Sequence, residues 1–124
     1  MESRLRNTFS KKERICGKKD ISRLLSEGRF GNSGCLRYCF IRDNGAGCDR
    51  IMVSVPKKLF KRAVRRNLLK RRIRESYRLN KKDLATGTPV DIMFVYGSRE
   101  ISGFNEICSS VRQAISQINR AGSK

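Results

Sequence analysis

The stretch K-K-L-F-K-R-A-V-R-R-N-L-L-K-R-R-I-R-E-S-Y-R, residues 57–78, decides how the rest of the chain is interpreted. Eleven of its 22 residues are Lys or Arg, and one, Glu75, is acidic. Apolar residues recur between the bases at the three- and four-residue spacing of an amphipathic helix. Pro56 stands just before the stretch, at a position where a helix can begin. The pattern predicts a long basic helix.

At 100° per residue this helix has one cationic face and one apolar face. The cationic face, here called the cationic strip, covers a sector of about 140° and consists of Ala63, Arg66, Asn67, Lys70, Arg71, Arg74 and Arg78. The opposite face holds Val64, Leu68, Leu69 and Ile73, with Arg65 and Arg72 among them. Like charges four residues apart destabilise a helix. A strip of one sign therefore indicates a polyanionic partner rather than a merely solvated face.

Length and charge narrow the class of protein. A chain of 124 residues has room for a single domain with a modest core. A net charge of +18 favours a nucleic acid as partner. A membrane is the weaker reading, because no apolar run approaches the roughly 20 residues that a spanning helix needs. The basic start of the chain has no apolar signal-peptide region, and the five cysteines are odd in number without framework spacing, so we expect a cytoplasmic protein.

The elements expected along the chain are helices and short strands. Residues 1–17 form a basic segment, either a flexible tail or an arm laid on the partner. A short helix over 21–27 has Asp20 as its cap and Gly28 as its stop. Alternation predicts a strand over 35–42, and the D-N-G-A-G loop at 43–47 predicts a hairpin with the strand 50–55.

Beyond the basic helix, the almost continuously apolar run 90–96 predicts a strand covered on both faces. An amphipathic helix follows, with Ser102 as its cap. Its apolar side consists of residues that recur at a spacing of three and four, namely Phe104, Ile107, Cys108, Val111, Ala114, Ile115 and Ile118. The fold class is therefore α+β, a small mixed sheet packed with helices in the order α-β-β-α-β-α. The basic helix would be the crossover between parallel strands, and crossovers are generally right-handed.

Catalytic groups are scarce in this chain. It has no His, its eleven acids are scattered singly, and no nucleotide-binding or nucleophile motif occurs. Asp91, inside a predicted strand, is best explained by pairing with an Arg. The broad strip has few base-reading side chains, which favours binding of the backbone of folded RNA. Tyr38 and Phe40 share a strand face and either stack on single-stranded bases or belong to the core.

The stretch resembles the protein subunit of bacterial ribonuclease P. That family has an R-N-x-x-K-R-x-x-R helix entered through an A-V dipeptide. The matching residues here are Ala63, Val64, Arg66, Asn67, Lys70, Arg71 and Arg74, followed by Glu75. The resemblance extends to F-S-K-K-E-R-I near the start, to a short helix ending in S-E-G-R, to the strand hairpin and to the amphipathic last helix.

The resemblance implies a function and a fold. Such proteins bind a catalytic RNA that removes the 5′ leader of precursor tRNA by Mg²⁺-dependent hydrolysis, with Mg²⁺ bound mainly by the RNA and the substrate. They also hold the leader in a cleft beside the sheet, which raises the affinity for substrate and metal. The family's βαβ crossover through the basic helix is left-handed, unlike the general expectation. We expect no catalytic or metal-binding side chain in the protein and no protein partner. The alternative is a ribosomal or general RNA-binding protein without a processing role.

Site residues follow from the strip and from the resemblance together. The expected RNA contacts are Lys57, Lys58, Arg62, Arg65, Arg66, Asn67, Lys70, Arg71, Arg74 and Arg78. Lys61 stands where many members of the family have Gly, which predicts an earlier start of the helix. Ile21 and Leu25 occupy positions that are aromatic in other members. The expected leader cleft therefore consists of Ile21, Leu25, Tyr38 and Phe40.

Overall fold

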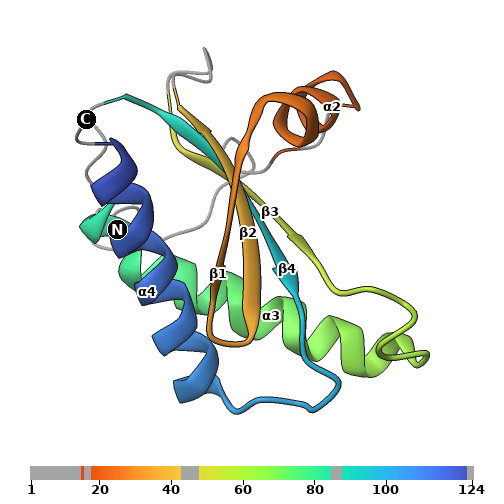
Figure 1. Ribbon diagram of the computed structural model, residues 1–124. Coiled ribbons are helices and arrows are strands. Elements are labelled where there is room, and N and C mark those ends of the chain that lie inside the picture. Colours follow the sequence, from red (N-terminus) through yellow and green to blue (C-terminus); the bar gives the residue numbers. More distant parts are fainter. Residues whose placement is uncertain (1–14, 16–17, 43–47, 85–87, 123–124) are drawn as a thin grey trace, which may run out of the picture.

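The computed structural model describes residues 15, 18–42, 48–84 and 88–122 (Figure 1). Four strands form one mixed sheet in the order β1-β2-β4-β3. The strands are β1 (Arg29–Ser33), β2 (Leu36–Arg42), β3 (Arg50–Ser54) and β4 (Val90–Tyr96). The helices are α2 (Lys18–Glu27), α3 (Ala63–Asn80), the short 3-10 helix η2 (Lys81–Asp83) and α4 (Phe104–Gly122). The α+β class and the mixed sheet expected from the sequence are confirmed.

The strand pairing differs from the expected hairpin. β4 lies between β2 and β3, antiparallel to β2 and parallel to β3, so β2 and β3 are not neighbours. The hairpin partner of β2 is β1, which sequence analysis missed. β4 takes a central place because it is apolar on both faces and only Val95 in it escapes full burial. The parallel pair of β3 and β4 makes α3 the connection of a βαβ unit, as expected.

The sequence of β1 does not show the pattern of a strand, because one glycine lies within it and another follows it directly. Gly34, with φ of +55°, closes the β1–β2 hairpin in a conformation that favours Gly. Gly31 pairs with Tyr38, and a side chain at Gly31 would collide with the Tyr38 ring. Gly31 is therefore needed for close packing inside a strand rather than for a turn.

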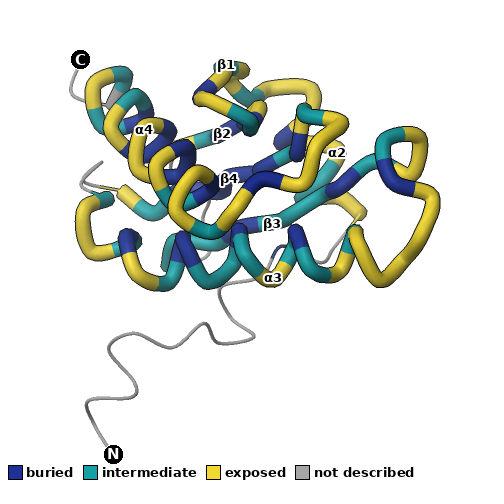
Figure 2. Tube along the Cα trace, turned by 90° about the horizontal axis from the view of Figure 1, so that it is seen from below, coloured by how far each residue is buried: buried dark blue, intermediate teal, exposed yellow. Residues whose placement is uncertain are grey.

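The two faces of the sheet are covered unequally. α3 and α4 pack on one face, here called the core face, while α2 lies on the other side (Figure 2). The core face holds the larger apolar cluster, with Phe94, Tyr96 and Tyr77 among its fully buried side chains. The other face, here called the open face, carries the smaller cluster of Ile15, Leu24, Cys39 and Met93.

α2 is held to the sheet near both of its ends. It begins at Lys18, so Asp20 lies in its first turn instead of capping it. Asp20 accepts a hydrogen bond of 3.3 Å from Arg50, which also forms a forked pair with Asp91 at 2.9 and 2.7 Å. The expected partnership of Asp91 with an Arg is thus confirmed. At the other end the thiol of Cys39 on β2 donates to the carbonyl of Leu24 at 3.1 Å. Gly28 stops the helix as expected, its N–H bonding to the same carbonyl at 2.9 Å.

The basic helix α3 begins later than expected. Arg62 is extended and occupies the N-cap, so Lys61 and the preceding bases stand outside the helix. The residues after Pro56 form a separate turn, in which the N–H of Leu59 bonds to the carbonyl of Pro56 at 3.1 Å. This turn brings Phe60 into the core at 6% exposure. Anchoring of Phe60 accounts for the delayed start, and the prediction of an earlier one was wrong.

α4 confirms the amphipathic pattern read from the sequence. Its buried side consists of Ile107, Ser110, Val111, Ala114, Ile115 and Ile118. Gly103, not Ser102, accepts the first helical hydrogen bond, from Ile107 at 3.1 Å. Ser102 is instead buried against Tyr96, whose hydroxyl donates to Ser102 Oγ at 2.8 Å. The predicted capping role of Ser102 was therefore wrong.

Candidate nucleic-acid interface

α3 turns its apolar side to the core and its bases outward. The buried residues recur at helical spacing and are Leu69, Ile73, Ser76, Tyr77 and Asn80. Val64 was expected on this side but is 78% exposed, because the first turn of α3 lies beyond the strands (Figure 1). Leu68 is half-buried, and Arg72 reaches the carbonyl of Ser102 at 2.6 Å. The predicted phase of the helix is correct from Leu68 onward.

The cationic strip is hollowed at its centre. Asn67, Arg71, Arg74, Glu75 and Arg78 line an open depression of about 320 Å³ on the outer surface of α3. Three guanidinium groups around one depression create a strong positive potential. Guanidinium forks match the geometry of phosphate oxygens, so the depression suits the backbone of a nucleic acid.

Glu75 is the one acid in α3, and it is paired with Arg78. Arg78 Nε and one terminal nitrogen donate to the two carboxylate oxygens at 2.9 and 2.5 Å. This hydrogen bonding lowers the pKa of Glu75, so its carboxylate is charged at neutral pH. Because Glu75 is 45% and Arg78 29% exposed, the pair adds little stability. Its effect is to fix the plane of the Arg78 guanidinium beside the depression.

Arg66, expected to contact RNA, is used within the protein. Its guanidinium donates to the carbonyls of Phe60 and Lys61, both at 2.8 Å. Arg66 therefore stabilises the turn that leads into α3. Beside this turn a second depression of about 330 Å³ is lined by Leu59, Phe60, Lys61, Arg62, Arg65 and Arg99. Arg99 follows β4 and was not predicted, since no helical or strand periodicity connects it with residues 61–65.

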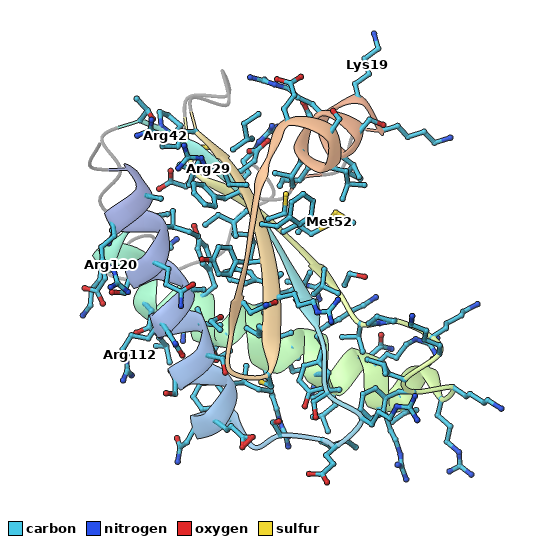
Figure 3. The ribbon with its side chains drawn as sticks, in the orientation of Figure 1. Lys19, Arg29, Arg42, Met52, Arg112 and Arg120 are labelled. Carbon is cyan, nitrogen blue, oxygen red and sulfur yellow. The ribbon has the colours of Figure 1, made fainter. Side chains whose placement is uncertain are left out.

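Lys57 and Lys58, the first bases of the basic stretch, are exposed in the turn that precedes α3. Of the other expected contacts, Lys70 is half-buried, whereas Arg62 and Arg65 are exposed. In Figure 3 many basic side chains extend outward around the first half of α3.

The expected leader cleft is divided between the two faces of the sheet. Ile21 is half-buried and Leu25 is 47% exposed, and both belong to α2 on the open face. Tyr38 and Phe40 lie on the core face, at 7% and 4% exposure. The Tyr38 hydroxyl donates to Gln117 of α4 at 2.5 Å. Both rings belong to the larger apolar cluster, so of the two alternatives, stacking on bases and a place in the core, the structure favours the core.

Comparison with known proteins identifies the family. The family model described as Ribonuclease P matches residues 9–119. The chain belongs to the ribonuclease P protein family. It is 33% identical over 117 residues to the ribonuclease P protein component of Porphyromonas gingivalis, covering 89% of this chain and 85% of the relative. With the ribonuclease P protein component of Dictyoglomus thermophilum it shares 43% identity over 74 residues, 60% of each chain.

Solved structures of the family have the same fold. The RNase P protein of Thermotoga maritima superposes with a TM-score of 0.72 at 24% identity, covering 85% of this chain and 96% of that one. The RNase P protein of Staphylococcus aureus gives 0.71 at 24% identity, over 86% and 94%. Ribonuclease P is a tRNA-processing ribonucleoprotein, so membership of this family gives the chain an RNA partner. No helix in the described part of the chain is long and apolar enough to cross a membrane.

Proposed function

We propose that the chain binds the catalytic RNA of ribonuclease P through α3 and assists that RNA in removing the 5′ leader of precursor tRNA. The observation that carries this proposal is the depression formed by Arg71, Arg74, Arg78 and Asn67 on the outward side of α3. Its size and its three guanidinium groups suit the phosphates of a folded RNA rather than a single base edge.

The single-stranded 5′ leader of precursor tRNA would lie on the open face of the sheet, beside α2. This face is bordered by the exposed Leu25 and contains partly buried apolar side chains from three strands, namely Ile41, Met52 and Val95. Figure 3 shows Met52 between α2 and β3, where that surface begins. An apolar surface next to basic residues suits a single strand, whose bases are unpaired and whose phosphates are charged.

The Mg²⁺ ions of the reaction would belong to the RNA and the substrate. The chain has no His, and among its described residues no three Cys, Asp or Glu side chains come together as metal ligands. The described donor set therefore does not fit a Mg²⁺ site. The protein would act on Mg²⁺ indirectly, by increasing the affinity for substrate at low Mg²⁺ concentration.

Reconstitution with the catalytic RNA tests the proposal. Purified protein, catalytic RNA and a bacterial precursor tRNA are combined at low Mg²⁺, and cleavage is measured with and without the protein. We expect the protein to stimulate cleavage and to have no activity alone. Absence of stimulation, with RNA binding retained, would favour the alternative of a general RNA-binding protein.

The role of α3 is tested by paired charge removal. Replacing Arg71 and Arg74 by Ala should reduce the slope of log K against log salt by about 1.4 to 1.8, since each lost phosphate contact is worth roughly 0.7–0.9. The matched control replaces Arg112 and Arg120, which point outward from α4 (Figure 3). An equal change in the control would mean that total charge, not the strip, determines binding.

A further inference from the structure

Phe30 stands out on the open face as an aromatic ring without a structural role. Its side chain is 67% exposed. Among the aromatic residues in the described part of the chain, Phe104 is half-buried and every other one is buried, so Phe30 alone is exposed. An isolated exposed Phe needs no explanation by itself. Its position on the sheet gives the reason to consider a ligand.

The strand register places Phe30 on the open face. Phe30 pairs with Cys39, and residues directly opposite in antiparallel strands point to the same side. Cys39 is buried beneath α2 in the cluster with Leu24 and Met93. Phe30 therefore lies at the margin of that cluster. Since β1 is an edge strand, one side of the ring faces solvent.

The neighbouring strand β2 carries a cation. Arg37 is on β2, pairs with Asn32 and with Val95, and so shares the open face with Phe30. The side chain of Arg37 runs toward β4, where its Cγ and Nε lie close to Gly97, so its guanidinium is directed away from the ring. Arg37 is exposed and has no ion pair within the described residues. The ring offers a stacking surface for one base, and the guanidinium offers a contact for a phosphate farther along the same single strand.

From this geometry we infer that Phe30 is a base-stacking residue for single-stranded RNA, with Arg37 as a phosphate contact farther along the same face. The inference rests on the proposed function, which supplies the single strand. It also assigns an aromatic contact to a face where α2 presents only Ile21 and Leu25. The ring comes from the edge strand β1 and not from the helix.

Charge favours RNA over a second copy of this chain as the partner that covers the surface around Phe30. A molecule with net charge +18 repels its own copies, and the exposed Arg29 and Arg37 flank Phe30 in β1 and β2. A polyanion would be attracted to the same surface. Because the ring is exposed, its substitution should leave the fold intact, and loss of binding can be assigned to the lost contact.

The decisive experiment uses full-length protein in complex with the catalytic RNA. The affinity for precursor tRNA is measured with a multi-nucleotide leader and with the leader removed. Phe30→Ala should weaken binding of the leader-bearing substrate roughly 5- to 150-fold, the range for loss of one stacked base. Phe30→Leu should lose most of the same factor, whereas Phe30→Tyr should retain it. Binding of the leaderless tRNA should not change in any variant.

Leu79→Ala is the matched control, because Leu79 is a 41% exposed apolar side chain on α3 rather than on the open face. Phe30→Trp adds a direct reading, since the chain has no Trp. The fluorescence of the introduced indole should report an exposed ring and should be quenched by a single-stranded oligonucleotide. Equal affinities for wild type and Phe30→Ala, or full affinity for Phe30→Leu, would overturn the inference.

Two further outcomes would also overturn it. A buried indole signal in the Phe30→Trp variant that oligonucleotide does not change would mean that another segment of the chain covers the ring. A dimer in sedimentation that Phe30→Ala dissociates would mean that a second copy is the occupant. The proposed function fails in a different way, because wild-type protein would then not stimulate cleavage by the catalytic RNA at all.

Discussion

Removal of the Asp91 carboxylate should destabilise the protein far more than removal of a surface acid. Asp91 is 4% and Arg50 14% exposed in side chain, and two hydrogen bonds of 2.9 and 2.7 Å join them. These hydrogen bonds raise the pKa of Arg50 further above its ordinary value, so the guanidinium stays charged at any pH of interest. Asp91→Ala therefore leaves a largely buried cation without its main partner.

The size of the expected loss of stability follows from the burial of the Arg50–Asp91 pair. Breaking a buried pair on one side costs about 3–5 kcal/mol. Asp20 remains 3.3 Å from Arg50 and is 41% exposed, which offsets part of the loss. We expect Asp91→Ala to lower the free energy of unfolding by about 2–3 kcal/mol and Tm by roughly 10 °C for a chain of this size.

The assay is urea unfolding followed by circular dichroism at fixed ionic strength. Glu75→Ala is the control, because it breaks an equally short Arg–carboxylate fork that is exposed, and it should cost less than about 1 kcal/mol. Replacing the buried pair together, as Arg50→Met with Asp91→Leu, should recover most of the loss. A cost for Asp91→Ala no larger than that of Glu75→Ala would refute the reasoning.

Three other outcomes follow from the structure. Tyr38→Phe removes the hydrogen bond to Gln117 and should lower stability by about 1 kcal/mol in urea unfolding, without changing leader affinity, since the ring is buried. Burial raises the pKa of the Cys39 thiol. The stability that the neutral thiol contributes is therefore complete below the pKa of the unfolded thiol and is lost as pH rises through the pKa of the folded one. We expect the stability of the Cys39→Ala variant to be less sensitive to alkaline pH than that of wild type. Val64→Ser should change the free energy of unfolding, measured in the same urea titration, by no more than about 0.5 kcal/mol, because Val64 is 78% exposed.

Local patterns in the sequence predicted the elements that carry their own periodicity. α4, β4 and the orientation of α3 from Leu68 onward could be read from spacing alone, because helical and strand periods determine which residues share a face. The outward cationic strip followed from the same arithmetic. Family membership then supplied the nature of the partner, which charge alone left open.

Features that depend on distant packing could not be predicted in this way. Alternation showed that Tyr38 and Phe40 share a face, but only the position of α4, which meets Tyr38 across 79 residues of sequence, shows that this face is covered. The order of the strands could not be predicted for the same reason, because it depends on contacts between segments that are far apart in the sequence. Arg99 joins the bases near α3 only through the fold. The strand that carries Phe30 was missed because glycines interrupt its sequence pattern.

The double attachment of α2 has a consequence for the thermodynamics of association. The thiol of Cys39 holds one end of α2 through the Leu24 carbonyl, and Arg50 holds the other end through Asp20. A helix fixed at two points cannot swing away from the sheet as a hinged lid would. An RNA single strand that docked beside α2 as proposed would meet a preorganised surface, so the ordering entropy on association would be lost by the RNA and hardly at all by the protein.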